Sequence, residues 1–450
     1  MTASRTICLG FLALIVIGTL LLWLPWSTET GTWNSFLTAF FTATSAVCVT
    51  GLSVVDTGTH YSFFGEAAIL GLIQVGGLGY MTATTFLLIL LGRRFGLREK
   101  LALQQSLDIG GISGAVQLVK SIIALTLIFE LTGMFCLLPT FMANHTPLYG
   151  VWLSLFHSIS AFNNAGFSLF SDSLVGYKTS VSINVVIPVL ILLGGFGYQT
   201  IMEVHEWGRY KLQSWLPRIW RRRTHRIVFS LNFKIAISTS VFLLLVGTII
   251  FFMIEYRNVL DGLSWSDRLM VSWFHAVMPR TAGFNSIDYG ALTTASIMLT
   301  MALMYVGANP GGTGGGIKTT TLRILFSSTK AVLQGKEEVR CYQRQIPVTL
   351  IIKAVGVVFG SGVTILAVTL LMSMTNPSIE FIQLLFETVS AFATVGLSTG
   401  ITASLSFSGK LLIIGTMYVG RVGVLLLMSS LLGDPKPSIV NFPEENLLVG

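Results

Sequence analysis

Four stretches of sequence decide the fold: FTATSAVCVTGLSVVD (41–56), FHSISAFNNAGFSLFSD (156–172), FHAVMPRTAGFNSID (274–288) and FETVSAFATVGLSTG (386–400). Each begins with Phe, continues through a short helix-compatible run, and reaches a single Gly followed by Leu or Phe. These glycines are Gly51, Gly166, Gly283 and Gly396, and their separations are 115, 117 and 113 residues. Such regular spacing indicates that the whole chain is four copies of one unit.

Long apolar stretches flank each of these motifs. They fall at about 7–24, 67–91, 116–139, 181–202, 229–254, 291–309, 346–374 and 407–432. Each can cross a hydrocarbon core of about 30 Å as a helix, with some tilt or a break. Only 11% of the 450 residues are charged and the mean hydropathy is +0.75, which excludes a large water-soluble domain. The sequence therefore predicts an all-α polytopic membrane protein of four span–pore-helix–span repeats, with eight transmembrane helices around one central pore.

The basic residues predict how the repeats are oriented. Of the 28 Lys and Arg, 22 fall in the two terminal segments and in the connections at 92–120, 203–234 and 318–353. Because loops rich in Lys and Arg stay on the cytoplasmic side, both termini and these connections are expected there. The run 221–223 is either this orientation signal or a docking surface for a soluble partner. The repeats are predicted at 1–110, 111–228, 229–345 and 346–450, the last including the C-terminal tail.

The four motifs are too short to cross the membrane, so each is expected to enter as a half-membrane helix and return through its Gly-containing loop. Non-helical backbone at this depth is tolerated where it lines a water-filled cavity, so four such loops imply a central pore. Gly allows positive φ, and rings of backbone carbonyls can replace the hydration shell of a monovalent cation. The negative C-terminal ends of the half-helices would favour a cation below this filter. The candidate filter residues are Val49, Thr50, Gly51, Ala165, Gly166, Ala282, Gly283, Val395 and Gly396.

Acidic residues follow three of the four filter glycines. Asp56, Asp172 and Asp288 lie five or six residues beyond their Gly, and Thr402 takes this place in the fourth copy. Three carboxylates at an outer mouth would concentrate cations and repel anions. Helix capping is the alternative role for these side chains.

The second spans share glycines near their middle, as in QVGGLGYMT (74–82), LLGGFGYQT (192–200) and YVGRVGVLL (418–426). Small residues of this kind would allow the four inner helices to approach one another closely. The third copy departs from this pattern, because YVGANPGGTGGGIKT (305–319) contains Pro310 and too many glycines for a regular helix. A phosphate-binding loop is excluded, since Ile317 separates the last Gly from Lys318 and no strand precedes the segment.

A non-helical loop at about 307–318, below the filter, predicts a gate. Arg421 lies at the matching level of the fourth repeat. An Arg deep in a span costs at least about 2.5–3.5 kcal/mol, so it should face the pore or a polar partner. Binding to the 309–316 loop would set a barrier to a cation, and the alternative is a structural pair with a buried acid such as Glu130. The candidate gate residues are Asn309, Gly311, Gly312, Thr313, Gly314, Gly315, Gly316 and Arg421.

The remaining polar residues of the spans do not suggest a reaction centre. Glu130, His157, His275 and Glu387 are dispersed along the chain. Thr42, His157, His275 and Glu387, which follow the four motif Phe residues, are expected to be buried hydrogen-bonding groups. Four widely spaced Cys and six His without paired spacing give no disulfide framework and no transition-metal site. The chain is therefore predicted not to be an enzyme and to carry no cofactor of its own, and the placement of its basic residues argues against nucleic acid.

Together these motifs resemble a known family. The segments TSAVCVTGL, SAFNNAGFSLF, PRTAGFNS and SAFATVGL, with TGGGIK and YVGRVG, are similar to the Trk/Ktr/HKT superfamily of potassium transporters. The tail NFPEENLLVG is most similar to the bacterial Ktr membrane subunits. The resemblance implies that the four motif glycines form the filter, that 307–318 is the gating loop and that Arg421 blocks the pore. Gly51 resembles the potassium-selective members, whereas Pro310 departs from the small-residue loops of the family.

The resemblance also implies partners and a transported ion. It implies a homodimer in membrane lipid with one pore per chain, and a cytoplasmic ring of nucleotide-binding regulatory subunits. Some members depend on sodium, so sodium is open as an activator. We expect potassium uptake across the cell membrane, driven chiefly by a potential worth about 2.3 kcal/mol per charge per 100 mV. The alternatives are a sodium- or proton-coupled potassium symporter on the same fold, a membrane-embedded enzyme, and a structural subunit of a larger complex.

Overall fold

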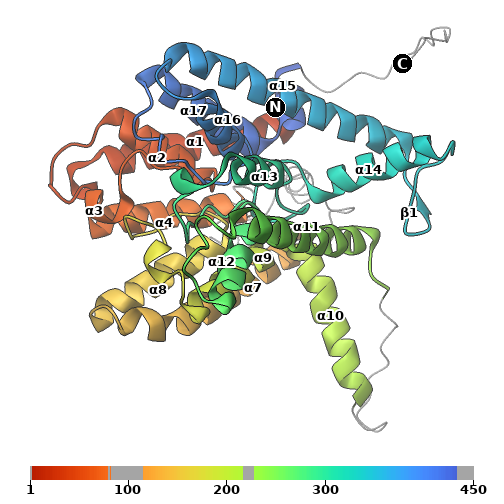
Figure 1. Cartoon of the computed structure of the whole chain (residues 1–450), viewed down its shortest axis with the longest axis horizontal. Helices are drawn as coiled ribbons and strands as arrows, with labels where there is room; N and C mark the ends of the chain where they lie inside the picture. The colour runs from red at the N-terminus through yellow and green to blue at the C-terminus, as the bar shows by residue number, and fades with distance from the viewer. Residues whose placement is uncertain (1–2, 80–81, 83–114, 216–227, 433–450) are drawn as a thin grey trace.

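Four long helices form the outer layer of the molecule, shown in Figure 1 as a computed structural model. They are α1 (Ala3–Trp23), α7 (Ala115–Met142), α11 (Leu231–Glu255) and α15 (Val348–Thr375). The structure describes residues 3–79, 82, 115–215 and 228–432. Within these ranges four helices are long and apolar enough to cross a membrane by themselves, and two bent helix pairs bring the crossings to as many as six. The predicted all-α polytopic membrane fold is confirmed.

A shorter helix follows each outer helix, where the sequence predicts a half-membrane helix. These pore helices are α2 (Phe36–Val47), α8 (Pro147–Phe162), α12 (Trp265–Val277) and α16 (Phe381–Phe392). The motif residues Phe41, Phe156, Phe274 and Phe386 are at most 1% exposed. At most 39% of the apolar membrane-spanning stretch of each outer helix is buried inside the protein. The core therefore consists of the pore helices and their return loops, and the outer helices present apolar side chains to lipid.

An inner helix returns after each filter motif. The inner helices are α4 (Phe63–Leu78), α9 (Val181–Phe196), α13 (Thr294–Tyr305) and α17 (Phe407–Val422). The sequence predicts spans with some tilt or a break at 181–202 and 407–432, and the structure has a sharp bend in each. The α9 helix bends by 103° into α10 (Tyr198–Trp215), and α17 bends by 94° into α18 (Val424–Leu432).

Glycines at equivalent positions cause these breaks. Gly79, Gly197 and Gly423 follow the ends of α4, α9 and α17 with φ of +79°, +81° and +90°. Gly adopts such angles without the steric cost that a Cβ imposes, so the helix can end abruptly there. In the third repeat α13 ends even earlier, ahead of the loop that contains Pro310. The inner helices of the first, second and fourth repeats are therefore 16 residues long, and that of the third is 12 residues long.

Three further inner-helix glycines approach the pore helices. The close approach between inner segments that the sequence predicts is also present, since a Cβ on Gly312 would lie 2.5 Å from the carbonyl oxygen of Gly195. A Cβ added to Gly76, Gly194 or Gly420 would lie less than 3.0 Å from the last carbonyl oxygen of the neighbouring pore helix. The return loop of each repeat is short, so the end of the pore helix must lie directly against the inner helix. The carbonyls belong to Val47, Phe162 and Phe392 respectively.

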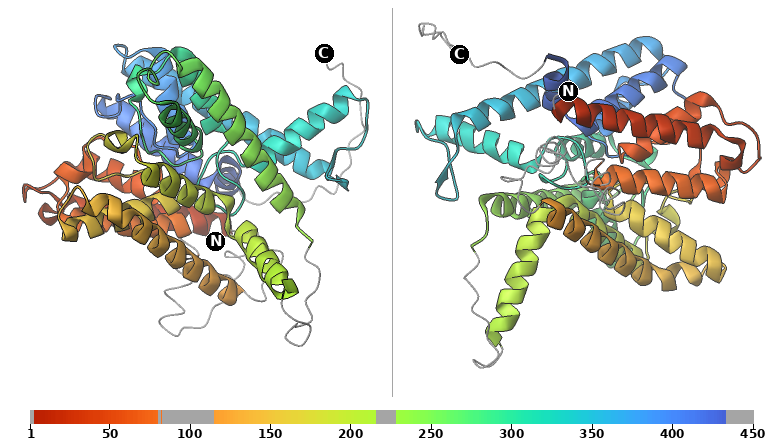
Figure 2. Two further views of the ribbon diagram at one scale, coloured as in Figure 1. Left: turned by 60° about the horizontal axis from the view of Figure 1, so that its bottom comes forward. Right: turned by 180° about the vertical axis from the view of Figure 1, so that it is seen from behind.

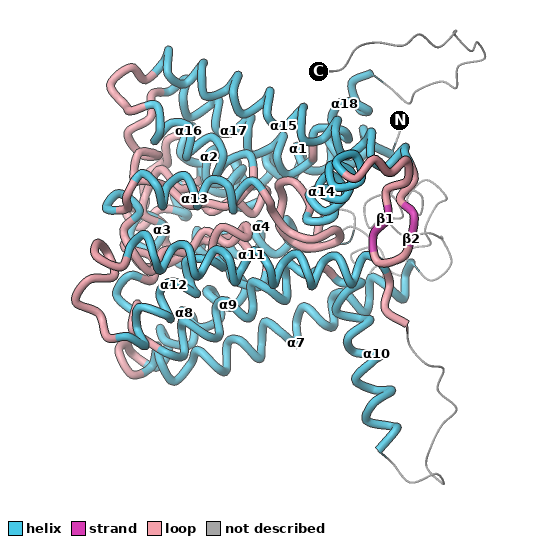
Figure 3. Tube along the Cα trace, turned by 45° about the vertical axis from the view of Figure 1, so that its right-hand side comes forward, coloured by secondary structure: helices cyan, strands magenta, loops and turns pink. Residues whose placement is uncertain are grey.

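The two ends of the molecule differ. The α10 helix projects from the bundle on one side, where α14 (Thr319–Leu333) leads into an antiparallel hairpin of β1 (Arg340–Cys341) and β2 (Arg344–Gln345) (Figure 3). The α3 helix (Thr57–His60) lies at the opposite end, as the additional views of Figure 2 also show. Shorter turns are η1 (Pro25–Ser27), η2 (Val175–Tyr177) and η4 (Tyr289–Ala291). The basic run 221–223, the tail after 432 and the predicted repeat boundary at 110–111 lie outside the described residues.

Serine hydroxyls explain where several helices begin. Ser62, Ser230, Ser264 and Ser406 accept hydrogen bonds from backbone N–H groups in the first turns of α4, α11, α12 and α17. A serine in this position satisfies a donor that the helix itself leaves free. The starts of two inner helices, one outer helix and one pore helix are thus set by local sequence.

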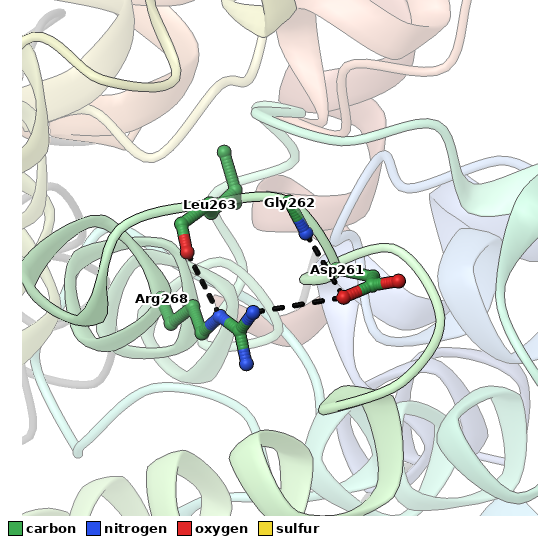
Figure 4. A network of polar contacts seen from close by, with 4 residues as sticks. All are labelled: Asp261, Gly262, Leu263 and Arg268. Carbon is green, nitrogen blue, oxygen red and sulfur yellow. Dashed lines mark hydrogen bonds and ion pairs between the residues drawn. The ribbon is translucent and has the colours of Figure 1, made fainter.

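The loop that leads into α12 is organised by one arginine (Figure 4). The Arg268 guanidinium lies 3.6 Å from the Asp261 carboxylate and donates to the carbonyl oxygen of Leu263 at 3.0 Å. The Gly262 amide donates to the same carboxylate at 3.0 Å. Asp261 is 74% exposed, and exposed ion pairs contribute only about 0–1 kcal/mol. These contacts therefore orient the entry to the third pore helix more than they stabilise the fold.

Candidate functional site

The four filter motifs meet in a closed ring. Each filter Gly lies against the next motif. A Cβ added to it would lie less than 3.0 Å from one backbone carbonyl oxygen there, which belongs to the residue that precedes the filter Gly of that next motif. The fourth motif closes on the first in the same way. The pairs are Gly51 with Ala165, Gly166 with Ala282, Gly283 with Val395, and Gly396 with Thr50. The fold thus brings together eight of the nine predicted filter positions, which lie up to 346 residues apart in sequence.

Left-handed backbone recurs at two positions in every motif. The filter glycines have φ between +70° and +91°, and the residues two positions earlier also have positive φ. Positive φ is uncommon for residues other than Gly, so four instances at matching positions indicate a loop geometry that the fold imposes. The predicted filter residues include the first of these and not the other three, although their fixed distance from the Gly is a signal in the sequence. They are Val49, Asn164, Thr281 and Thr394.

Serines of the pore helices hold three of the return loops. In the first and fourth repeats a serine hydroxyl accepts from the amide of the filter Gly, and in the second a serine donates to a loop carbonyl. These serines are not among the predicted site residues, although three motifs share the dipeptide Ser-Ala. The third motif is one residue shorter and has Met278 in this region. The bonds join Gly51 N to Ser45 Oγ and Gly396 N to Ser390 Oγ at 3.1 Å each, and Ser160 Oγ to Phe167 O at 2.8 Å.

A cavity of about 480 Å³, here called the mouth cavity, opens on one side of the ring. All four filter glycines line it, together with Asp56, Asp172 and Asp288. Each Asp also accepts a hydrogen bond from a backbone amide two or four residues later, at 2.8–3.0 Å. The three carboxylates therefore cap local turns and also face the mouth cavity, so the two interpretations of the sequence are compatible.

Residues 306–318 form an irregular loop that contacts three of the filter motifs. The Thr313 hydroxyl donates to Asn164 Oδ1 at 3.3 Å, and the Gly315 amide donates to Thr394 Oγ1 at 3.0 Å. A Cβ on Gly314 would collide with the hydroxyl of Thr281. The loop thus touches the left-handed residue of the second, third and fourth motifs.

The same loop is anchored to the surrounding helices. Val306 and Ile317 form a bridge that closes the loop at its base. The Asn309 amide N–H donates to the carbonyl of Gly195 at 3.1 Å, and the Asn309 side chain accepts a hydrogen bond from the Thr319 hydroxyl. These contacts join the loop to α9 and to the start of α14, so a movement of either helix would be transmitted to the loop.

Arg421 bridges this loop to the first repeat. Its guanidinium donates to the carbonyl oxygen of Thr313 and to that of Gly76 on α4. Glu130 is not its partner, because that carboxylate accepts from Gln74 at 3.2 Å and from Asn163 at 2.9 Å. The alternative prediction, an ion pair between Arg421 and Glu130, is therefore wrong. The predicted contact between Arg421 and the 309–316 loop is observed.

A second cavity of about 260 Å³, here called the loop cavity, lies against this bridge. Its lining includes the segment 311–314, the glycines of α4 and α9, and the cations Arg421 and Lys318. The Lys318 ammonium donates to the carbonyl of Gly314 at 2.7 Å. Lys318 is not among the predicted gate residues, and this contact with the loop was not expected from the sequence.

The polar residues that follow the motif phenylalanines are buried and hydrogen-bonded, as predicted. Thr42, His157, His275 and Glu387 are each at most 1% exposed. Their partners lie in their own repeats, so they do not converge on a common centre. Within the described ranges there is also no group of three or more His, Cys, Asp or Glu that could hold a metal ion.

The fold and the site define a class: a polytopic helical membrane protein in which four return loops meet in a ring. The crystal structure of the potassium transporter TrkH from Vibrio parahaemolyticus is similar, with a TM-score of 0.69 at 19% identity, over 95% of this chain and 85% of that chain. This likeness concerns the fold. The family model described as TrkH, cation transport protein, matches residues 1–432. The chain belongs to the TrkH family of cation transport proteins, and it is a transport protein and not an enzyme.

Characterised relatives match over nearly their whole length. Ktr system potassium uptake protein B from Bacillus subtilis (strain 168) is 37% identical over 451 residues, which cover 100% of this chain and 97% of that protein. Potassium/sodium uptake protein NtpJ from Enterococcus hirae is 36% identical, covering 99% and 97%. Ktr system potassium uptake protein B from Vibrio alginolyticus is also 36% identical, covering 99% and 94%. The chain is thus a multi-pass integral membrane transporter of the Ktr/Trk group.

Proposed function

We propose that this chain takes up potassium across the cell membrane through a pore lined by the backbone of the four filter motifs. The observation that carries the proposal is the closed ring of filter glycines, in which each loop packs on the next. Rings of backbone carbonyls can replace the hydration shell of a monovalent cation. The names of the Bacillus subtilis and Vibrio alginolyticus relatives, both potassium uptake proteins, support potassium as the cation.

In this proposal the filter consists of the residues that precede and include the ring glycines. Alternation of left-handed and ordinary backbone turns successive carbonyls toward one side of a loop, and every motif has this alternation. The mouth carboxylates would gather cations at the entrance. The residues are Val49, Thr50, Gly51, Ala165, Gly166, Ala282, Gly283, Val395 and Gly396 for the filter, and Asp56, Asp172 and Asp288 for the mouth.

The gate of the proposal is the irregular loop at 307–318 with Arg421. The loop contacts three filter motifs, and the Arg421 guanidinium ties it to α4. A fixed positive charge beside the loop cavity would oppose the passage of a resting cation. Release of the Arg421 contacts would free the loop, whose glycines and Pro310 give it little helical preference. The gate residues are Asn309, Gly311, Gly312, Thr313, Gly314, Gly315, Gly316 and Arg421.

The chain is proposed to work as a membrane subunit with a separate regulatory component. The word "system" in the names of two relatives supports an assembly. We place both termini, α10, α14 and the hairpin on the cytoplasmic side, because the connections that contain them hold the basic residues. A homodimer and a ring of nucleotide-binding regulatory subunits on that side complete the proposal. Sodium is proposed as an activator, in line with the potassium/sodium uptake protein from Enterococcus hirae.

Growth of cells that lack their own potassium uptake tests the proposal. Expression of this chain with its regulatory partner should restore growth at low potassium. Absence of growth, with membrane insertion verified, would contradict potassium uptake. A sodium- or proton-coupled symporter on the same fold would also restore growth, so the mechanism is separated by the flux measurement described at the end of the Discussion.

A further inference from the structure

The residue that follows the motif Phe ties each pore helix to the chain beyond its own filter. In every repeat this residue is buried and its side chain bonds to a side chain that comes after the filter Gly. We call these four contacts the filter ties. They are Tyr61 Oη donating to Thr42 Oγ1 at 3.0 Å, Ser168 Oγ with His157 Nε2 at 3.0 Å, Tyr289 Oη with His275 Nδ1 at 3.2 Å, and Thr402 Oγ1 donating to Glu387 Oε1.

The filter ties share a position and a hydroxyl group on the residue after the filter, but no two repeats use the same pair of side chains. The hydroxyl residues lie ten, two, six and six residues beyond the filter Gly. A connection that recurs with four different side-chain pairs indicates that the fold needs this link and accepts several ways to make it. Because each tie joins the segment before the filter to the segment after it, the return loop is held at both ends.

The fourth filter tie is the one built on a carboxyl group. Glu387 is fully buried, and its Oε2 atom has no hydrogen-bond partner within the described part of the chain. Its other oxygen accepts from Thr402, and the Ser398 hydroxyl also interacts with the carboxyl group. A buried polar atom without a partner costs about 1–3 kcal/mol, so a carboxyl group in this position calls for an explanation beyond packing.

Thr402 connects Glu387 to the mouth cavity. It stands where the other repeats have Asp56, Asp172 or Asp288, and it lines that cavity. The hydroxyls of Ser398 and Thr402 lie 2.9 Å apart, and Ser398 also lines the cavity. The fourth repeat thus lacks the carboxylate at the mouth and has one behind the filter, linked to the mouth by two hydroxyls.

We infer that Glu387 is a positioning residue for cation selectivity, which acts through Thr402 to fix the fourth filter loop at Val395 and Gly396. The inference rests on the proposed function. Loosening this tie frees the loop to move, so that its carbonyl oxygens are no longer held at the spacing that suits potassium and can close on the smaller sodium ion. The other three loops keep their own ties, so the pore still conducts.

The test compares rubidium and sodium uptake by purified full-length protein in liposomes. Thr402→Val removes the hydroxyl and keeps the shape, and Thr399→Val is the matched control, because the Thr399 hydroxyl has no partner in the described part of the chain. We expect Thr402→Val to lower the rubidium-to-sodium ratio by about three- to tenfold, the range for loss of one hydrogen bond. Thr399→Val should leave the ratio unchanged.

Substitutions of Glu387 complete the test. Glu387→Gln keeps an oxygen that accepts from Thr402 and should retain the wild-type ratio, whereas Glu387→Ala should lower it as Thr402→Val does. The double variant should be no worse than either single variant, because both remove the same interaction. Wild-type selectivity in Thr402→Val would overturn the inference, even where Glu387→Ala fails to fold. A wild-type protein that does not prefer rubidium to sodium would instead refute the proposed function.

Discussion

At the scale of single residues, Gly51 faces the backbone of the neighbouring repeat. A Cβ at this position would lie 2.5 Å from the carbonyl oxygen of Ala165, so a side chain must displace the second loop as well as strain its own. We predict that Gly51→Ser admits more sodium. The expected loss in the rubidium-to-sodium uptake ratio is about tenfold, which corresponds to about 1.4 kcal/mol.

Gly31→Ser is the control for this substitution. Gly31 also has positive φ, at +66°, but a Cβ there would have no atom within 4 Å. The control therefore imposes similar backbone strain away from the ring, and its uptake ratio should match the wild type. Equal selectivity in Gly51→Ser and the wild type would remove Gly51 from the filter.

Arg421 gives a second prediction at this scale. Its guanidinium donates to the carbonyls of Thr313 and Gly76, and alanine would remove both contacts and the charge. Arg421→Ala should therefore raise rubidium flux severalfold in liposomes. Arg340→Ala, which removes an exposed arginine paired with Glu338, should leave flux unchanged. Flux unaltered in Arg421→Ala would exclude this residue from the gate.

At the scale of elements, the irregular loop is the part whose removal should matter most. It contacts three filter motifs and two helices, so it lies close enough to the filter to restrict the path. Deletion of residues 309–316 should raise rubidium flux while the filter motifs keep their selectivity. A deletion variant that inserts normally and shows wild-type flux would contradict a gating role for the loop.

The elements also show how far the sequence could predict this structure. The pore helices were predictable because their motifs repeat and their phenylalanines mark one buried face. The sequence allows a break in each apolar stretch, but the positions of the bends at Gly197 and Gly423 were not predictable, since a Gly in an apolar helix is equally compatible with close packing, and its φ is set by what surrounds it. For the same reason the sequence placed Gly194 and Gly420 between inner helices, whereas the structure places them against pore-helix ends.

The contacts that join different repeats at the candidate site could not be predicted from the sequence. The sequence identifies Arg421 and the loop because they occupy equivalent positions in the fourth and third repeats. The other carbonyl that accepts from Arg421, that of Gly76, lies 345 residues away and could not be identified in this way. Glu130 was a plausible partner for Arg421 by depth alone. Glu130 instead bonds to Gln74 and Asn163, and these bonds depend on how the first repeat packs against the second. Composition and residue spacing carry no information about that packing.

At the scale of the whole molecule, the mouth cavity concentrates negative charge from three repeats. We predict that the triple change of Asp56, Asp172 and Asp288 to Asn raises the apparent KM for rubidium a few-fold at low ionic strength. Asn is also a good capping residue, so the turns should persist while the charge is lost. The difference should shrink in high salt, because screening weakens the field of exposed charges.

Asp261→Asn is the control for this effect. Asp261 is an exposed acid in the loop before α12 and does not line the mouth cavity. Its replacement should leave the KM unchanged at any salt concentration. A triple variant with the wild-type KM at low ionic strength would show that the three mouth residues serve only as caps.

The central claim is that the ring of four loops conducts potassium down its electrochemical gradient. Rubidium uptake into liposomes that contain only the purified chain, with an inside-negative potential and no sodium, tests this claim most directly. We predict uptake that rises with the potential and is abolished when the potential is collapsed. Uptake that requires an added sodium or proton gradient at fixed potential would contradict the claim and establish a coupled symporter.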